Sequence, residues 1–326
     1  MSSVKNKALT EGAFFAAFAA LLGLIGLYVP PLYFFTTLLV PLPLAVLVRR
    51  HDLVAGLKAL AVTTFLMFIF FGEPFTVLIL VIQFGPLGLL LGALFKNHIP
   101  AGPSIAASSI MAAFLTVVTI ALGFWITGIN PFAMGQEMRQ AMEQAGNWYA
   151  RAGLVDAESE QQLREFSEQM ISLLAVLLPG SLAVWALTSA LLTYLIARAV
   201  FIRLNYSVPP IPPFSHWRYP WYSLWGITVG LGLVLAGDQW GLDLVGNIGA
   251  NILYVFAAVF FVLGLSVLSF YLKRWQVMKL VKVIIIITAV LYWPFAVVGI
   301  ITMGVLDPIF NSRRLPPADE SGPGKE

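Results

Sequence analysis

The sequence predicts an all-α fold, a polytopic transmembrane helical bundle of about eight to nine spans. Of its 326 residues, 59% are hydrophobic and only 11% are charged, and the mean hydropathy is +0.87. Several apolar runs exceed the roughly 18 residues that a helix needs to cross a bilayer. The basic residues also gather in every second connection between these runs. Together these observations exclude a soluble domain and predict a multi-pass membrane protein.

The apolar runs define the predicted helices in chain order. They cover residues 9–28, 32–48, 53–71, 74–95, 104–127, 170–197, 221–236, 246–272 and 280–306. The second run is the weakest because it is short and contains Pro41 and Pro43, which cannot donate backbone hydrogen bonds. We expect it to be broken or re-entrant, which is tolerated only where protein or a wet cavity satisfies the freed backbone.

The charges of the connections indicate the orientation. Lysine and arginine occupy the amino terminus and the connections near residues 49–50, 96, 198–218 and 273–279. The short connections between them hold acidic residues, Glu73, Asp238 and Asp243, and no basic one. This alternation predicts a cytoplasmic amino terminus. Nine crossings would leave Arg313 and Arg314 outside, so we expect an exception there or an error among the last spans.

The predicted domains follow from this pattern. Residues 1–129 and 170–312 hold the transmembrane helices, the latter with a cytoplasmic Pro-rich loop at 205–220, and residues 313–326 have the composition of a disordered tail. Residues 130–169 predict an extracytoplasmic, mostly acidic helical hairpin, with Asp156 as the N-cap of its second helix. Two interpretations stay open for the hairpin: a solvated cap on the bundle, or a receptor-like cap over a ligand entrance.

The first span sorts its residues by size. Gly12, Ala13, Ala16, Ala17 and Ala20 fall on one arc of the helix, and phenylalanines and leucines on the other. No hydrophobic drive brings helices together in lipid, so a small-residue face serves close packing, and bulky residues face acyl chains or the core. The sequence therefore predicts a helix-docking face. Its partner is either another protein or a later helix of the same chain.

Two other patterns concern packing and the Pro-rich loop. Gly85, Gly88 and Gly92 make a small face on their predicted helix, and Gly226 and Gly230 make another. The prolines of residues 208–214 predict polyproline II. Such a segment suits either a stiff connector at the membrane interface or a docking ligand for a partner.

Polar side chains that could meet a ligand gather in the predicted outer half of the bundle. The candidate substrate-binding residues there are Glu73, Trp125, Asn130, Asn247 and Asn251, and Gln83, in the middle of its span, is a further candidate. Asn247 and Asn251 are four residues apart and share a helix face. The alternative for this pair is an interhelical hydrogen bond at a tight crossing. For Glu73 the alternative is a charge that complements the helix dipole at Pro74.

The sequence shows no catalytic or metal-binding constellation. The absence of cysteine excludes disulfides, thiolate metal sites and cysteine nucleophiles. His51, His98 and His216 lie in predicted connections without a carboxylate at metal-binding spacing. Carboxylates deep in the spans, which ion-coupled carriers usually need, are nearly missing. We expect a protein that is not an enzyme and that needs no metal or cofactor.

Two motifs give the chain a family resemblance. One is LTEGA at residues 9–13 leading to LYVP at 27–30, and the other is VPPIPPF at 208–214 followed by Trp217 and Arg218. With these motifs the chain resembles, over nearly its whole length, the YybS-like family of bacterial polytopic membrane proteins of unknown function. That family looks distantly similar, over about residues 1–203, to the S components of energy-coupling-factor vitamin transporters.

The resemblance implies a function and partners. In S components an Ala-x-x-x-Ala pattern on the first helix packs on a transmembrane coupling subunit powered by separate ATPases, and Ala13 with Ala17 and Ala16 with Ala20 match it. It implies a protein of the bacterial cytoplasmic membrane that binds or helps transport a small solute. No nucleic-acid partner is expected. The alternative is a non-transporting interaction protein that serves assembly or signalling in the cell envelope.

Overall fold

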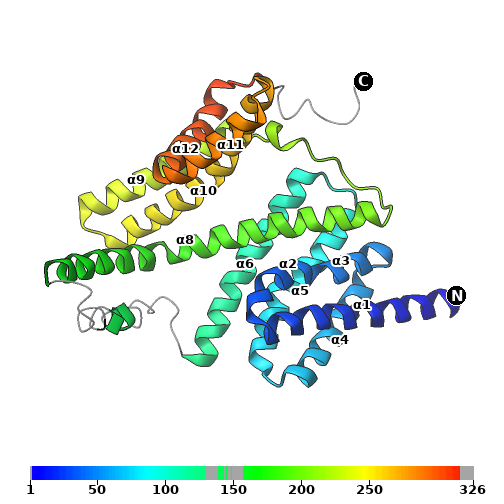
Figure 1. Cartoon of the computed structure of the whole chain (residues 1–326). Coiled ribbons are helices and arrows are strands. Elements are labelled where there is room, and N and C mark those ends of the chain that lie inside the picture. Colours follow the sequence, from blue (N-terminus) through cyan, green and yellow to red (C-terminus); the bar gives the residue numbers. More distant parts are fainter. Residues whose placement is uncertain (1, 129–138, 143, 146–147, 149–156, 316–326) are drawn as a thin grey trace. The chain divides into compact units, whose positions relative to one another are not determined.

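The computed structural model describes residues 2–128, 139–142, 144–145, 148 and 157–315 (Figure 1). These residues form helices, 3₁₀ turns and connections without a strand, which confirms the all-α class. In this part of the chain, eight helical segments are long and apolar enough to cross a membrane. The fold divides into two compact units. Unit 1 comprises Met1–Met134 and Leu182–Ile211, and unit 2 comprises Gly135–Ser181 and Pro212–Glu326.

The helices follow the predicted apolar runs closely. Unit 1 holds α1 (Ser2–Tyr28), η1 (Pro30–Leu32), α2 (Tyr33–Leu39), α3 (Pro41–Arg50), α4 (Leu53–Phe71), α5 (Pro74–Lys96), α6 (Ala101–Thr127) and the carboxy-terminal part of α8 (Ala157–Arg203). Unit 2 holds the first part of α8 with η3 (Phe214–His216), η4 (Trp221–Leu224), α9 (Trp225–Trp240), α10 (Asp243–Arg274), α11 (Lys279–Leu291) and α12 (Trp293–Phe310). The second hairpin helix runs into the sixth span as predicted, whereas Asp156 and most of the first hairpin helix lie outside the described residues.

The second predicted span is divided, as expected. α2 ends before Val40 and α3 begins at Pro41, yet Val40 keeps helical backbone angles, with φ −52° and ψ −40°. The interruption therefore lies in the hydrogen bonds that Pro41 and Pro43 cannot donate, not in a change of direction. The segment Pro30–Arg50 is 67% buried, the largest share among the candidate spans. Burial inside the protein is the condition under which a membrane helix tolerates such a break.

Glycines bring α5 against this divided segment. A Cβ atom added to Gly88 would lie 2.5 Å from the carbonyl oxygen of Pro41, and one added to Gly92 would lie 2.6 Å from that of Ala45. Only glycine lets the two backbones approach this closely, which is how helices gain packing energy in lipid. Gly85 instead meets a side chain of α4. The predicted small face on this helix is therefore a packing face within unit 1.

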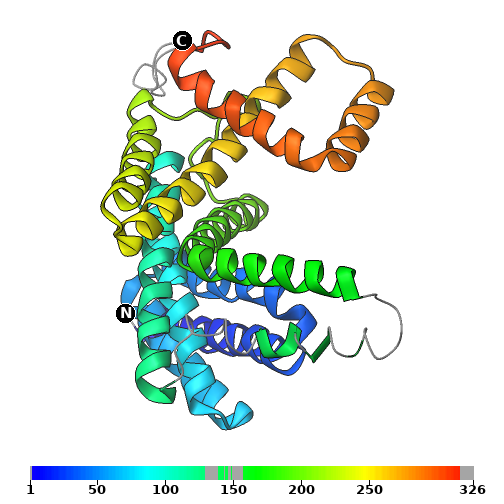
Figure 2. The same ribbon diagram turned by 90° about the vertical axis from the view of Figure 1, so that its left-hand side faces the viewer.

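Unit 2 is also packed through glycines. A Cβ atom on Gly249 would lie 2.7 Å from the carbonyl oxygen of Gly230, and Gly226 lies against an aromatic ring of α10, so α9 and α10 touch closely. α10 crosses α12 in the same way, because a Cβ atom on Gly264 would clash with the carbonyl oxygen of Ile300 (Figure 2). The small face predicted at Gly226 and Gly230 is thus confirmed as a helix–helix contact.

The prediction of one last span at residues 280–306 is wrong. The structure has two helices there, α11 and α12, which meet at Tyr292 (Figure 2). Hydropathy stays high across the junction, so the apolar run does not reveal it; the local signal is Pro294 in the first turn of α12. The 13 residues of α11 span only about 20 Å at a rise of 1.5 Å per residue, less than the hydrocarbon thickness.

Candidate functional site

Two of the predicted binding residues, Glu73 and Trp125, have no ligand-like setting in the structure. Glu73 is exposed at the amino terminus of α5, where its side chain makes no capping hydrogen bond. Trp125 is 81% exposed on α6. Asn130 lies outside the described residues. A role for these three residues in binding stays a prediction.

Gln83 connects α5 to α6. Its amide nitrogen donates to the hydroxyl of Thr116 at 2.9 Å, and its amide oxygen accepts from the hydroxyl of Thr119 at 2.9 Å. Both ends of the amide are therefore occupied, in the pattern of an interhelical polar contact inside a membrane protein. Gln83 holds two helices together, and a ligand would have to compete with both threonines.

Asn251 on α10 binds the backbone of α8 near Pro179. Its Oδ1 accepts from the N–H of Gly180 at 2.6 Å, and its Nδ2 donates to the carbonyl oxygens of Val176 and of Asn247, each at 2.8 Å. Gly180 and Val176 stand four residues apart, as donor and acceptor do in a regular helical turn. The Asn251 amide reaches both groups next to the helix proline, which supports the alternative of an interhelical hydrogen bond for this asparagine.

The predicted docking face of α1 is divided in two. Ala16 and Ala20 are buried, at 0% and 3% exposure, and pack with α3, α4 and α5 inside unit 1. The hydroxyl of Thr63 on α4 donates to the carbonyl oxygen of Ala16 at 3.1 Å. Ala13 and Ala17 remain exposed. Gly12 has open space where a Cβ would lie. One half of the face thus has its partner within the amino-terminal helices, and the docking role of the other half stays a prediction.

A cavity of about 510 Å³ lies in unit 1 between α1, the divided segment α2–α3 and the end of α8. We call it the α1–α8 groove. Its lining comprises Phe14, Phe15, Phe18, Leu22, Leu39, Leu42, Pro43, Val46, Arg50, Val200, Leu204 and Tyr206. Leu42, Pro43 and Val46 are buried and form its floor, while Phe14 and Phe18 are exposed at its rim. The bulky arc of α1 thus lines an apolar groove that is open at the rim.

The polar members of the lining are Arg50 and Tyr206. The Nε of Arg50 donates to the Tyr206 hydroxyl at 3.2 Å, and its Nη1 lies 3.4 Å from Glu11 Oε2. The same carboxylate oxygen lies 2.8 Å from His51 Nε2. The side chain of Arg50 is 43% exposed, compared with 20% for Glu11. A half-exposed guanidinium therefore stands at one end of an otherwise apolar groove.

More cations surround this end of unit 1. Lys96, at the end of α5, donates from Nζ to the carbonyl oxygen of His51. Arg49 lies over the Tyr206 ring, 5.3 Å from its centre. Its Nη1 donates to the carbonyl oxygen of Lys96 at 3.4 Å, while its buried Nε has no hydrogen-bond partner in the described structure. Cations at the carboxyl ends of α3 and α5 complement the helix dipoles and give this region a positive character.

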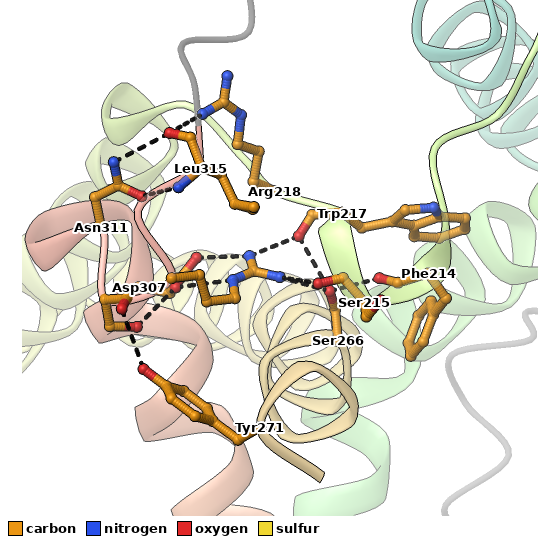
Figure 3. Close-up of polar contacts among 11 residues, drawn as sticks. Phe214, Ser215, Trp217, Arg218, Ser266, Tyr271, Asp307, Asn311 and Leu315 are labelled. Carbon is orange, nitrogen blue, oxygen red and sulfur yellow. Dashed lines mark hydrogen bonds and ion pairs between the residues drawn. The ribbon is translucent and has the colours of Figure 1, made fainter. Parts of the chain in front are cut away.

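Unit 2 contains a second charged centre, around the ion pair of Arg313 with Asp307. Figure 3 labels Asp307 together with Ser215, Trp217 and Ser266, which also belong to this centre. The Arg313 guanidinium is fully buried and pairs with Asp307 through two contacts, Nε to Oδ1 at 3.0 Å and Nη2 to Oδ2 at 2.7 Å. The remaining N–H groups donate to the carbonyl oxygens of Ser215 and Trp217, at 2.8 and 2.7 Å, and to the Ser266 hydroxyl at 2.9 Å. All five guanidinium donors are used.

This centre attaches the Pro-rich loop to α10 and α12. The hydroxyl of Ser266 on α10 donates to the carbonyl oxygens of Phe214 and Trp217 in the loop (Figure 3). Arg313 follows the end of α12 in the chain. Pro213 has φ −52° and ψ 144°, the polyproline II angles predicted for this segment. Because every donor of the buried cation has a protein partner, the centre has a structural role and offers a ligand no free charge. We call it the carboxy-terminal staple.

Sequence reasoning missed both charged centres. Glu11 and His51 are 40 residues apart in the chain, and Arg313 lies 98 residues from Ser215. Neither spacing is a motif, so only the fold brings these groups together. The available signal was weaker: a glutamate in the first turns of a predicted span, and an aspartate and an arginine at the end of the last one. Buried or part-buried charges in such positions are usually paired.

The helices, their apolar surfaces and the glycine contacts between them define a polytopic, all-α integral membrane protein. The chain belongs to the family described as "Predicted membrane protein (DUF2232)", whose model matches residues 17–308. It is also similar to the uncharacterized protein YybS of Bacillus subtilis (strain 168), with 27% identity over 314 residues, which are 95% of this chain and 98% of that relative. No solved structure matches the chain.

Proposed function

We propose that this membrane protein binds an amphiphilic molecule, with its apolar part in the α1–α8 groove and its polar part at Arg50. The observation that carries the proposal is the asymmetry of the groove: an apolar lining with a guanidinium and a phenol at one end. Its volume of about 510 Å³ falls within the range of roughly 300–1,000 Å³ that small-molecule sites occupy. The exposed rim at Phe14 and Phe18 gives access from the side of the bundle.

The orientation proposed for the chain puts this polar end at the cytoplasmic face. Arg49, Arg50 and Lys96 end helices there, and the positive-inside rule favours the cytoplasm for such clusters. In unit 2, the staple brings Arg313 to the same end as the Pro-rich loop, near Lys273. This supports a cytoplasmic carboxy terminus, which would remove the conflict that nine crossings create.

Reporter fusions test this orientation. A cytoplasm-active fluorescent protein attached after the last residue should fluoresce, and one attached after Asp238 should not. A periplasm-active phosphatase in the same two positions should give the opposite result. A phosphatase signal from the carboxy-terminal fusion would contradict the assignment.

Photolabelling tests the proposed binding. The purified full chain is incubated with a long-chain fatty alcohol that carries a diazirine, and labelled peptides are mapped by mass spectrometry. We expect label on the peptides that contain Phe14 and Val46. Val200→Trp should fill the groove and reduce this label, whereas Ile202→Trp, on the exposed side of α8 and outside the lining, should not. Equal labelling of the two variants, or label spread evenly over all spans, would refute the proposal.

A second candidate function is docking on a transmembrane coupling subunit, as the S-component resemblance implies. The exposure of Ala13 and Ala17 favours it, because a partner helix could still approach that strip. The test is co-purification in gentle detergent. Ala13→Leu together with Ala17→Leu should release the partner without unfolding the chain, whereas Ala16→Leu would disturb internal packing and is uninformative. Retention of every co-purifying protein by the double variant would exclude docking through this strip.

A further inference from the structure

We infer that the ligand of the groove is an anionic phospholipid whose phosphate takes the place of Glu11 at Arg50. This inference rests on the proposed function and adds the chemistry of the headgroup. Three observations support it: the exposure and orientation of Arg50, the long contact between Arg50 and Glu11, and the excess of positive charge around these two residues.

Arg50 is positioned to bind an anion at the end of the groove. Its Nε is fixed by the Tyr206 hydroxyl at 3.2 Å, which orients the guanidinium, and 43% of the side chain is exposed. Arginine can present two parallel N–H groups to a phosphate, a geometry that lysine cannot reproduce. A phospholipid whose acyl chain lies over Leu42 and Val46 would place its phosphate near this fork, because Arg50 lines the same cavity.

Glu11 is the internal anion of Arg50, but the contact between these two side chains is long and part-exposed. Its Oε2 lies 3.4 Å from Arg50 Nη1 but 2.8 Å from His51 Nε2, so the shorter contact is with the histidine. A part-exposed ion pair of such length contributes little to stability. If a phosphate displaced the carboxylate from Arg50, Glu11 would keep His51. The exchange therefore leaves no carboxylate stranded.

The surrounding charge favours an anionic headgroup over a zwitterionic one. Among the described side chains at this end, the cations Arg49, Arg50 and Lys96 outnumber the carboxylates Glu11 and Asp52. Asp52 is engaged as the N-cap of α4 and accepts from the Ala55 N–H at 2.7 Å. Basic pockets between helices at the cytoplasmic face are where anionic headgroups bind. A choline or ethanolamine group would add a further cation to this region and gain nothing from it.

Lipid binding to the purified full chain, measured by native mass spectrometry, tests the inference. Phosphatidylglycerol and phosphatidylcholine with identical acyl chains are added separately. We expect the wild type to take up phosphatidylglycerol in preference. Arg50→Gln should lower its affinity about tenfold, the scale of a lost charge-assisted hydrogen bond. Arg274→Gln, which removes an equal charge in unit 2, should leave the affinity for phosphatidylglycerol unchanged. Arg50→Lys should give an affinity between those of the wild type and Arg50→Gln. If Arg50→Gln fails to fold, Arg50→Lys provides the test in its place.

The remaining arms separate the possible outcomes. Glu11→Gln removes the internal competitor and should raise phosphatidylglycerol binding, so a decrease in the folded variant would contradict the exchange. Equal uptake of the two lipids by the wild type would overturn the inference. Displacement of phosphatidylglycerol by an equal concentration of inorganic phosphate would overturn the assignment to a lipid. In both cases the fatty-alcohol label could still reach the groove, and only its loss there would remove the proposed function itself.

Discussion

Replacing Arg313 by methionine is expected to destabilise unit 2 strongly. Methionine keeps an apolar side chain of comparable length but removes all five donors of the staple. The Asp307 carboxylate, 6% exposed, would then keep only the Ser312 hydroxyl at 3.0 Å. The carbonyl oxygen of Ser215 would lose the donor that bonds to it at 2.8 Å. The Trp217 carbonyl would retain its contact with Ser266.

The expected magnitude follows from these losses. A buried charge left without its partner costs about 3–5 kcal/mol, and an unsatisfied buried carbonyl about 1–3 kcal/mol. Combining Arg313→Met with Asp307→Leu removes both charges and leaves mainly the carbonyl of Ser215. Since a buried ion pair can often be replaced by apolar residues at little net cost, the double variant should be more stable than either single variant.

Two measurements check this prediction. Unfolding of the detergent-solubilised protein by sodium dodecyl sulfate, followed by circular dichroism, ranks the two single variants and the double variant. A local probe comes from the absence of cysteine: Ser215→Cys, at a position only 2% exposed, should react slowly with a maleimide in the wild-type background and quickly with Arg313→Met. Additive losses in the double variant, or unchanged labelling, would refute the view that this ion pair secures the loop.

Three further predictions concern helix contacts. Asn251→Ala should lower stability by roughly 1–2 kcal/mol, because two backbone groups of α8 lose their hydrogen-bond partner. Asn247→Ala should leave stability unchanged, because the exposed side chain of Asn247 makes no hydrogen bond within the described structure. Thermal unfolding compares the two variants. Gly88→Val should abolish the yield of folded protein, because the added side chain would separate α5 from α3. Gly12→Val should keep this yield, because Gly12 has open space where a Cβ would lie. Size-exclusion profiles of the two variants measure the yield. Gln83→Leu should cost roughly 0.5–2 kcal/mol by releasing α6, and an unchanged unfolding midpoint would argue against that contact.

Helix positions in this chain could be predicted because burial in lipid imposes a simple rule. An apolar run of sufficient length must close its own backbone hydrogen bonds, so the run and the helix coincide. The predicted bounds 53–71 are those of α4, Leu53–Phe71, where Asp52 supplies an N-cap and Gly72 ends the helix with φ +73°. The glycine faces were predictable for the same reason, since in lipid close packing needs small residues.

The polar sites could not be predicted, because each depends on which helices become neighbours. Gln83 and Asn251 were identified as polar groups in the membrane, but whether an amide faces a ligand or another helix is not encoded within its own span. The sequence around Asn251 contains neither Gly180 nor Val176, its partners on α8. The sequence around Arg50 indicates only an orientation, because the groove beside this residue forms when Phe14 of α1 and Val200 of α8 lie together.

The first helix shows where the limit of sequence reasoning lies. The small residues on one arc of this helix indicate a face for close packing. In the structure, part of that arc is buried against other helices and part is exposed. Ala16, Ala20 and Gly23 meet α3, α4 and α5, and a Cβ on Gly23 would fall 2.7 Å from Met67, so this side is closed by the amino-terminal helices themselves. Ala13 and Ala17, on the adjacent side of the same helix, remain exposed. A partner that docks on the small-residue face of α1 therefore meets the strip of Ala13 and Ala17 beside the rim of the groove, and a partner bound there would also cover the rim at Phe14.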